Sequence, residues 1–437
     1  MKTLSLILLT SLAVLSPCLL AAENWPQLRG PEFNGSSPEG KVPTTFSKTE
    51  NVAWSVKMSG ASASTPVVWK DHVFVTSADK ETKAVEAICI DRTTGKERWT
   101  KRFESEIARD NKSNYAAPTP ATDGERVLFF FSSGDLLAFD FDGKELWKLN
   151  IQEEYGPFTF QWTFSTSPVL YDGVVYMQVL QRDVPVHGQG YKDKKNESYL
   201  LALDAATGNE LWRHIRPSDA KAESLEAFTT PMIYNHEGQT QLIVCGGDCI
   251  SGHDIDNKGQ EIWRWGTWNP TKIGHWRLVP SPVAAEGIAL ACAPKREPVY
   301  AVKLGGKGNL SDEALAWTSS NKEISSDVPT PVYYGGRFYV LHGNRSTLSC
   351  LKPSGEIVWS ERLGRTEFEA SPTAAGGKLF LMDHGGKVYV VKAGDQFDLL
   401  HSAEMGEENA RSTRSTIAVA QEQLFIRTNG VLYCIGG

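Results

Sequence analysis

Ten polar and aromatic side chains, all in predicted links between strands, could together bind a polar ligand. Arginine can clamp an anion through paired hydrogen bonds, and tryptophan or tyrosine can stack on a ring. We predict that these residues face one central mouth of the fold: Tyr115, Trp162, Glu226, Trp268, His275, Trp276, Arg277, Asp327, Glu369 and Arg414. The alternative is that the charged members pair with one another and close that mouth.

The densest local group consists of Trp265, Trp268, His275, Trp276 and Arg277. As a binding surface, this group would form a platform for a sugar or another ring. The alternative is a long loop whose aromatic side chains pack on one another.

No familiar catalytic signature is present. The sequence contains no GxSxG elbow, no P-loop and no HExxH motif, and its cysteines and histidines lack zinc-type spacing. We predict no metal site and assign no catalytic residue. We expect Asp383-His384 and the turn at residues 342–345 to be ordinary polar turns. Catalytic groups contributed by separate repeats would leave no local motif, so an enzyme is not excluded.

The charge balance is acidic. The 437 residues include 45 Lys+Arg and 52 Asp+Glu, which gives a formal net charge of -7 at pH 7. This balance argues against nucleic acid and anionic membranes as partners.

The first 22 residues resemble a secretory signal. Lys2 precedes an apolar run from Leu4 to Val14, and Ala21 and Ala22 suit cleavage near Ala22. The residues before Cys18 resemble a lipidation signal, but Pro17 fits it poorly, so we expect cleavage rather than a lipoprotein. No second hydrophobic stretch predicts a membrane span. We therefore predict a periplasmic or secreted chain with an N-terminal arm at residues 23–51 and a single domain at 52–437.

These candidate residues must be positioned by a repeated unit. A Ser or Thr followed by Pro opens the unit seven times, and Ser415-Thr416 is a degenerate eighth copy. Apolar stretches separated by a turn follow each copy, which predicts two strands. The seven copies are Thr65-Pro66, Thr119-Pro120, Ser167-Pro168, Thr230-Pro231, Ser281-Pro282, Thr330-Pro331 and Ser371-Pro372.

A second signature completes each unit. Ala202 to Trp212 reads ALDAATGNELW, which predicts a strand, a turn at Gly208 and a second strand that carries the tryptophan. We predict that the tryptophans at this position pack between neighbouring units. They are Trp54, Trp99, Trp147, Trp212, Trp263, Trp317 and Trp359.

Four antiparallel strands per unit, repeated eight times, predict an all-β, eight-bladed β-propeller. The last unit ends after its third strand at residues 431–435, and residues 52–56 supply a strand without a partner of their own. We predict that this N-terminal strand completes the last blade and closes the ring, which removes an open sheet edge. We expect the chain to be a monomer.

The order of strands in a blade fixes where the candidate residues gather. Links from an outer strand to the next inner strand lie on one face, together with the turns between second and third strands. These links are the longer ones, and propeller ligands bind at the central mouth of such a face. An insertion at residues 181–198 carries Lys192, Lys194 and Lys195 and is either a docking element or a solvated loop.

Cys89, Cys350 and Cys434 occupy equivalent positions of one repeated strand and are predicted to be small core residues. Cys245 and Cys249 flank the turn Gly246-Gly247-Asp248. A disulfide across this turn and two free thiols both fit that spacing.

The repeats resemble the pyrroloquinoline-quinone (PQQ) repeat, the AxDxxTGxxxW-type blade of quinoprotein alcohol dehydrogenases and of the outer-membrane assembly lipoprotein propeller. Trp25 to Pro31 and the segment Asn51 to Trp54 resemble the start of exported bacterial PQQ-binding-like propellers. The resemblance covers residues 24–437. It implies the propeller fold strongly and the function weakly, because the motif encodes blade packing. The adjacent cysteine pair of the dehydrogenases and a CxxCH haem motif are absent.

Three functions are compatible with this sequence. The resemblance and the missing quinone signatures favour a non-catalytic binding or scaffold protein of the bacterial cell envelope, with an envelope protein or polysaccharide as partner and no cofactor. The first alternative is a PQQ-dependent oxidoreductase that acts on alcohols or sugars with PQQ and calcium. The second is a carbohydrate-binding propeller that uses the loop around Trp268 and Trp276.

Overall fold

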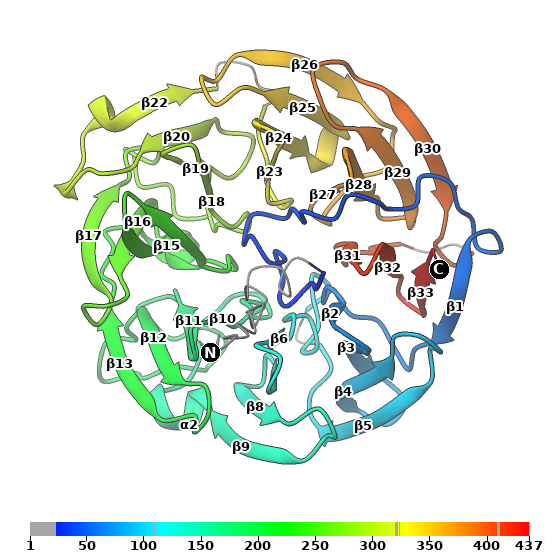
Figure 1. Ribbon diagram of the computed structural model, residues 1–437. Helices are drawn as coiled ribbons and strands as arrows, with labels where there is room; N and C mark the ends of the chain where they lie inside the picture. Colours follow the sequence, from blue (N-terminus) through cyan, green and yellow to red (C-terminus); the bar gives the residue numbers. More distant parts are fainter. Residues whose placement is uncertain (1–22, 109, 320–321, 323, 409–410, 437) are drawn as a thin grey trace, which may run out of the picture.

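A computed structural model of the chain describes residues 23–436, apart from 109, 320–321, 323 and 409–410. The predicted signal segment 1–22, with Cys18 and the expected cleavage near Ala22, lies outside the described residues. Within them, the strands form eight sheets arranged radially as the blades of a propeller (Figure 1). The all-β, eight-bladed prediction is confirmed.

Each sheet runs from an inner strand at the central axis to an outer strand at the rim, with antiparallel neighbours. The first blade consists of β2 (Val67–Trp69), β3 (His72–Asp79), β4 (Ala84–Asp91) and β5 (Glu97–Glu104), and the second of β6 (Ala121–Thr122), β7 (Val127–Phe130), β8 (Asp135–Phe139) and β9 (Glu145–Asn150). The third consists of β10 (Val169–Tyr171), β11 (Val174–Val179), β12 (Tyr199–Asp204) and β13 (Glu210–Ile215). The fourth consists of β14 (Met232–His236), β15 (Gln239–Gly246), β16 (Cys249–Asp254) and β17 (Gln260–Trp265).

The fifth blade consists of β18 (Val283–Ala285), β19 (Ile288–Cys292), β20 (Val299–Lys303) and β22 (Leu315–Thr318), and the sixth of β23 (Val332–Tyr334), β24 (Arg337–His342), β25 (Thr347–Leu351) and β26 (Ile357–Arg362). The seventh consists of β27 (Thr373–Ala375), β28 (Lys378–Met382), β29 (Lys387–Lys392) and β30 (Leu399–Glu404). The eighth consists of β31 (Ala418–Ala420), β32 (Gln423–Arg427), β33 (Val431–Ile435) and β1 (Val52–Lys57).

A few short elements accompany the blades. Strand β21 (Gly308–Asn309) adds to the outer edge of β17 in parallel. The helical pieces are α2 (Ile151–Tyr155) and the 3-10 turns Ala222–Leu225, Asp312–Ala314 and Gly343–Arg345. Among the described residues, no helix has the length and apolar character needed to cross a membrane.

The ring closes through the N-terminal strand. Strand β1 pairs antiparallel with β33, so Trp54 lies opposite Cys434 and Val56 opposite Leu432. Figure 1 shows this pairing as the blue β1 beside the red β33. The predicted completion of the last blade is confirmed, and both ends of the propeller are held in one sheet.

Six of the repeated tryptophans pack on the next blade as predicted, whereas Trp263 donates to Gln241 Oε1 of its own blade at 2.8 Å. The Trp99 ring lies on Gly143 of the next blade, and its Nε1 donates to the Phe141 carbonyl at 2.9 Å. Gly143 has φ +82°, and a Cβ there would lie 2.8 Å from the Trp99 ring, so this turn requires glycine. The same stacking recurs for Trp54 on Gly95, Trp147 on Gly208, Trp212 on Gly259 and Trp317 on Gly355.

The six cysteines among the described residues are free thiols. Cys89, Cys350 and Cys434 are fully buried, as predicted for small core residues. Cys249 pairs with Gly246 and Cys245 with Ile250 across the β15–β16 hairpin. Since neighbouring residues of a strand point to opposite faces, the Cys245 and Cys249 side chains leave opposite faces of the sheet. The structure therefore has no disulfide across this turn.

Candidate functional site

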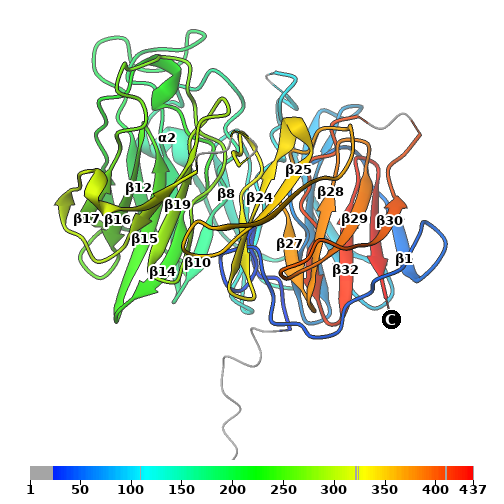
Figure 2. The same ribbon diagram turned by 90° about the horizontal axis from the view of Figure 1, so that it is seen from above.

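The long links between blades gather on one face, where a central cavity of about 200 Å³ opens. Figure 2 shows that the loops of the teal and green blades extend furthest on this face. The cavity is lined by Trp162, Arg277, Glu369 and Arg414 from the predicted set, together with Lys112 and the Ser and Thr residues that open the inner strands. Four of the ten predicted residues therefore lie together at the mouth.

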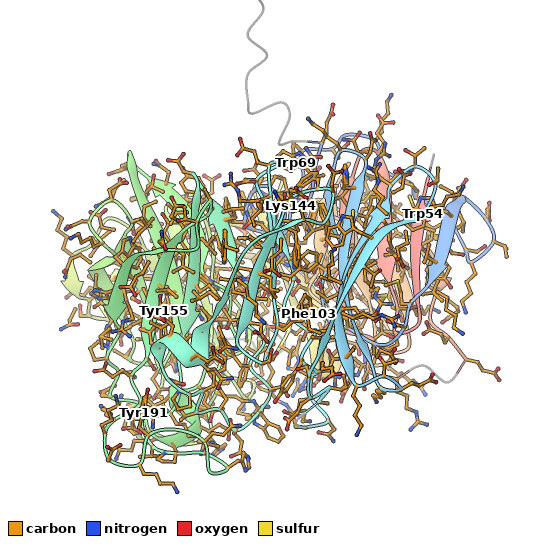
Figure 3. All side chains as sticks on the ribbon, turned by 90° about the horizontal axis from the view of Figure 1, so that it is seen from below. Trp54, Trp69, Phe103, Lys144, Tyr155 and Tyr191 are labelled. Carbon is orange, nitrogen blue, oxygen red and sulfur yellow. The ribbon has the colours of Figure 1, made fainter. Side chains whose placement is uncertain are left out.

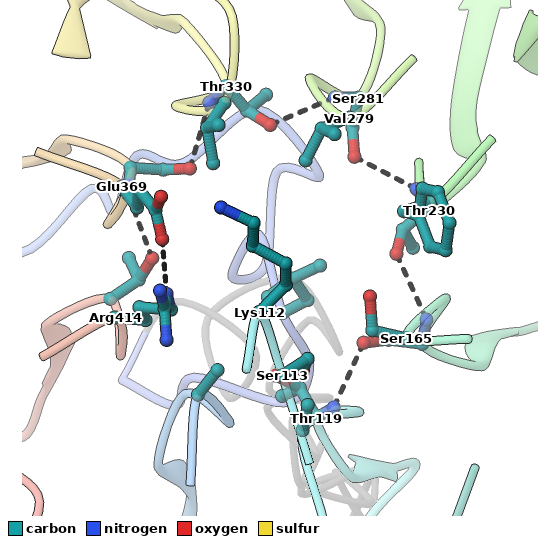
Figure 4. A pocket seen from close by; sticks show the side chains of 18 of the residues that line it. Lys112, Ser113, Thr119, Ser165, Thr230, Val279, Ser281, Thr330, Glu369 and Arg414 are labelled. Carbon is teal, nitrogen blue, oxygen red and sulfur yellow. Dashed lines mark hydrogen bonds and ion pairs between the residues drawn. The ribbon is translucent and has the colours of Figure 1, made fainter. Parts of the chain in front are cut away.

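A belt of hydroxyl groups surrounds the channel below this mouth. The backbone N–H of each opening Ser or Thr donates to the hydroxyl of the corresponding residue in the next blade, as part of Figure 4 shows. The distances are 3.0 Å for Thr65 to Thr119, 2.9 Å for Thr119 to Ser167, 3.1 Å for Ser167 to Thr230, 2.9 Å for Thr230 to Ser281, 3.0 Å for Ser281 to Thr330, 2.9 Å for Thr330 to Ser371 and 3.2 Å for Ser371 to Thr416.

The opposite end of the channel is covered by the N-terminal arm. Trp25 is fully buried and forms a bridge with Val68, and Leu28 reaches the cavity from below. The buried Arg29 guanidinium donates to the Pro331 carbonyl at 2.7 Å and to the Pro372 carbonyl at 3.4 Å. Burial lowers the pKa of Arg29 to about 9. The cavity therefore opens on the loop-rich face.

One wall of the mouth is a charged cluster. Arg414 Nε donates to Glu369 Oε2, and His384 Nε2 lies 3.4 Å from the same oxygen. Burial alone would raise the pKa of Glu369, but the hydrogen bond from His384 and the charge of Arg414 outweigh it and lower the pKa to about 2. Glu369 is therefore a carboxylate throughout the physiological range.

The opposite wall combines aromatic and charged groups. Arg277 Nη1 donates to Glu223 Oε1 at 3.0 Å, and Trp162 Nε1 donates to the same oxygen at 2.7 Å. The Arg277 guanidinium lies 5.4 Å from the centre of the Trp162 ring, within reach of a cation–π interaction. Glu223 thus holds a stacked Arg–Trp pair against the mouth.

Glu226 lies behind this wall, not in the cavity lining. It is fully buried, forms an ion pair with Arg182, and accepts from the Gln161 N–H at 3.0 Å. Burial raises the pKa of Glu226, while Arg182 and the Gln161 hydrogen bond lower it, and the result is about 7. The expectation that Glu226 faces the mouth is corrected, because the Gln161 and Arg182 segments lie over its carboxylate.

The remaining predicted residues lie outside the cavity lining. Tyr115 borders a neighbouring cavity and donates to Glu106 Oε2 at 3.0 Å, and Asp327 accepts from the Lys295 N–H at 2.8 Å. His275 is exposed, and the partly buried Trp276 packs against the core of its blade.

Trp268 is also corrected. It is buried against Trp265 and Tyr300, with ring centres 5.6 and 6.3 Å away. The loop that carries Trp268 and Trp276 thus directs its largest apolar rings into the blade core. The loop is therefore packed on itself and on its blade, which was the alternative to a ring-binding platform.

Sequence reasoning missed Lys112, Glu223 and the hydroxyl belt, and it took His384, which lies 3.4 Å from Glu369 Oε2, for an ordinary turn residue. Lys112 extends across the cavity in Figure 4, and its loop is held by Asp110 Oδ2, which accepts from the Thr163 N–H at 2.6 Å. The belt had a visible signal in the repeated Ser or Thr before proline. Glu223 and His384 had none, because their partners come from other links.

The donor set suits an anion better than a metal-bound quinone. Lys112, Arg277 and Arg414 give the lining three cationic groups, of which Arg277 is paired with Glu223 and Arg414 with Glu369. Calcium takes about six to eight oxygen ligands. Among residues 23–436 as described, no group of three or more His, Cys, Asp or Glu could hold a metal ion. The described lining of the mouth therefore offers cationic groups rather than a cluster of carboxylates.

Comparison with solved structures supports the architecture. BamB from Moraxella catarrhalis is 12% identical, with a TM-score of 0.58, over 88% of this chain and 97% of that chain. A europium-containing methanol dehydrogenase is also 12% identical, with a TM-score of 0.67, over 96% of this chain and 99% of that chain. Likeness at this identity shows the shared fold alone.

Comparison of sequences adds the family. The outer membrane protein assembly factor BamB of Yersinia pestis is 20% identical over 312 residues, which are 69% of this chain and 72% of that protein. The profile of the PQQ-repeat family described as "Outer membrane protein assembly factor BamB" matches residues 38–177 and 307–435, which is more than half of the chain. The chain therefore belongs to this family of PQQ-repeat propellers.

Proposed function

We propose that this protein is a non-catalytic binding propeller of the bacterial cell envelope, which holds an envelope protein or polysaccharide at its loop-rich mouth. The observation that carries the proposal is the arrangement of Lys112, Arg277 and Arg414 around a cavity closed from below by the arm. Such a mouth takes up an acidic group of a partner and has no exit on the other side. The family membership and the BamB relatives support a location in the envelope.

The volume of the cavity and the fixed orientation of its arginines favour a single side group of a larger partner over a whole cofactor as the occupant. Small-molecule sites are typically about 300–1,000 Å³, whereas this cavity is about 200 Å³. Arg277 and Arg414 are already oriented by Glu223 and Glu369. Preorganised guanidinium groups bind a carboxylate without a further ordering cost. We include cleavage of the leader near Ala22 and the single propeller of residues 52–437 in this proposal.

Photo-crosslinking in the native host tests this assignment. p-Benzoylphenylalanine at Val328, which lines the mouth, should give a discrete crosslinked product. The matched control places it at Tyr171, at the opposite end of an inner strand, where no such product is expected. The double change Arg277→Ala and Arg414→Ala should abolish the product, whereas Arg365→Ala, exposed in a link of the same face, should preserve it. Equal products from both crosslinker positions, or none from Val328, would contradict the proposal.

The second candidate is PQQ-dependent oxidation. It is favoured by the fold shared with the europium-containing methanol dehydrogenase and by three cations that could face the carboxylates of a quinone. Spectroscopic titration with PQQ and Ca²⁺ separates the two functions. We expect no saturable change, and saturable binding together with oxidation of an alcohol by a dye-linked assay would reverse the preference.

A further inference from the structure

A second cavity of about 320 Å³ lies on the flank of the propeller, away from the central mouth. Three tyrosines and three cationic residues stand out in its lining: Tyr155, Tyr191, Tyr199, Lys194, Lys195 and Arg213. They come from α2, the insertion at residues 181–198, and strands β12 and β13. Figure 3 shows Tyr155 and Tyr191 on one flank, with Tyr191 in the loops at the end opposite Trp69.

The cationic groups of this cavity lie over aromatic rings. Lys194 Nζ is 3.9 Å from the centre of the Tyr191 ring, and Arg213 is 5.4 Å from the Tyr155 ring. Within the part of the chain that the structure describes, none of Lys194, Lys195 and Arg213 forms an ion pair with a carboxylate. Lys194, Lys195 and Arg213 outnumber the exposed Glu197, so the lining has a net positive charge. The cations of the cavity therefore outnumber its carboxylates, with Glu197 in the lining and Glu210 beside Tyr155.

Tyr199 supplies an unsatisfied hydroxyl in the same lining. Only 2% of the residue is exposed, and its hydroxyl has no hydrogen-bond partner among the described residues. A buried hydroxyl without a partner costs stability, so its presence here needs a reason. A ligand that accepts from Tyr199 provides one.

The wall formed by the insertion is held in a fixed shape. Asn196 is buried, accepts from the Tyr191 N–H at 2.7 Å and donates to the Asp183 carbonyl at 3.3 Å. Gly156 has φ +108°, and a Cβ there would lie 2.7 Å from the Tyr191 ring. Only glycine at this position allows the ring to approach so closely. The insertion is thus a built wall of the cavity.

We propose that this flank cavity binds an acidic saccharide, a sugar ring that carries a carboxylate. Tyrosine rings stack on the apolar face of a sugar, and the partly exposed rings of Tyr155 and Tyr191 offer two such surfaces. Lys194, Lys195 and Arg213 would bind the carboxylate through charge-assisted hydrogen bonds. An acidic peptide would use the cations but would leave the rings of Tyr155 and Tyr191 without a partner of matching shape.

Calorimetric titration of the full mature chain with trigalacturonate tests the proposal. We expect saturable binding that weakens with added salt, and no binding of the neutral galactose trimer. The double change Lys194→Ala and Lys195→Ala, and separately Arg213→Ala, should each weaken binding at least about tenfold. The matched control is Lys192→Ala, an exposed lysine of the same insertion outside the cavity lining, which should bind as the unchanged chain does.

Tyr199→Phe separates a binding role from a structural one. It removes only the hydroxyl, so it should weaken trigalacturonate binding about fivefold without lowering the unfolding temperature. Arg277→Ala should leave this binding unchanged, which keeps the outcome independent of the central mouth. The proposal is overturned if trigalacturonate does not bind, if the neutral trimer binds equally, or if Lys192→Ala causes the same loss. Equal affinity for tetraglutamate would overturn it in favour of an acidic peptide.

Discussion

Glu226 and Glu369 are a matched pair of carboxylates with opposite behaviour. Each precedes an inner strand in a link on the loop-rich face, and each forms an ion pair with an arginine from another link. Yet the pKa of Glu226 is raised to about 7, whereas that of Glu369 is lowered to about 2. Pairing with arginine alone therefore does not fix the charge state.

The difference comes from burial and from the number of side chains that contact each carboxylate. The Glu226 side chain is 0% exposed and has one cationic partner, Arg182. The Glu369 side chain is 24% exposed, and both Arg414 and His384 reach its carboxylate. Desolvation outweighs a single partner at Glu226, and two partners outweigh a smaller desolvation at Glu369. Glu369 is thus ionised throughout the physiological pH range, whereas Glu226, buried behind the opposite wall, titrates near neutral pH.

Removal of the single partner should have the largest effect. Arg182→Ala leaves the Glu226 carboxylate buried without a cation, so we expect a loss of about 3 kcal/mol in the free energy of unfolding at pH 8.5. Urea unfolding measures it. At pH 5, where Glu226 is protonated, the loss should shrink to the packing contribution of the arginine.

A second substitution checks that the effect acts through Glu226. In the Arg182→Ala background, Glu226→Gln replaces the buried charge by a neutral group of the same shape and should recover most of the stability lost at pH 8.5. No recovery would mean that Arg182 stabilises the fold by packing alone.

Arg414→Ala should have a smaller effect at the opposite wall. Glu369 keeps His384 and is partly exposed, so we expect a loss of about 1–2 kcal/mol at pH 7 by urea unfolding. The loss should fade as the pH drops from 4.5 towards 2, because the protonated Glu369 no longer needs a cation. Arg365→Ala, an exposed arginine of the same face, should change stability by less than about 0.5 kcal/mol. A loss from Arg414→Ala as large as that from Arg182→Ala would remove the contrast between the walls.

The two carboxylates should also respond to pH with opposite signs. The ordinary glutamate pKa is 4.5, and the folded value at Glu226 is about 7, so its contribution to stability is complete below 4.5 and is lost as the pH rises through 7. At Glu369 the folded value is about 2, so its contribution is present above 4.5 and is lost as the pH falls through 2.

Glutamine substitutions measure these two windows. As the pH rises from 5 to 8, Glu226→Gln should become more stable relative to the unchanged chain. Glu369→Gln should be less stable than the unchanged chain at pH 4.5, and this difference should disappear as the pH falls to 2. Each change should be about 2–3 kcal/mol, since each folded pKa differs from 4.5 by about 2.5 and a pKa difference of one corresponds to about 1.4 kcal/mol. Parallel pH profiles for the two variants would show that their environments do not differ as described.

The propeller could be predicted from the sequence because its signals are local and repeated. The Ser/Thr-Pro openings, the tryptophan positions and the unpartnered strand at residues 52–56 each depend on neighbours in the chain, and together they imply the closed ring. The charge pairs depend instead on which links meet. Arg182 approaches Glu226 from an insertion, and His384 approaches Glu369 from the β28–β29 turn of the blade that follows it. Neither pairing has a sequence spacing that indicates it. The length of its loop predicts an exposed Trp268 at the mouth. In the structure the large apolar ring is instead buried in the core.

The hydroxyl belt beneath both walls gives the smallest effect and tests whether floor and walls are independent. Thr119 Oγ1 accepts from the buried Thr65 N–H at 3.0 Å, while the Thr65 hydroxyl has no partner among the described residues. Thr119→Val should therefore cost about 1 kcal/mol in urea unfolding, because it leaves the Thr65 N–H without an acceptor, and Thr65→Val should cost close to nothing. Since neither change touches a carboxylate, the pH windows of Glu226 and Glu369 should stay where they are. Equal losses from the two threonines would mean that side-chain volume, rather than hydrogen bonding, joins the inner strands, and a shifted pH window would mean that the floor positions the walls.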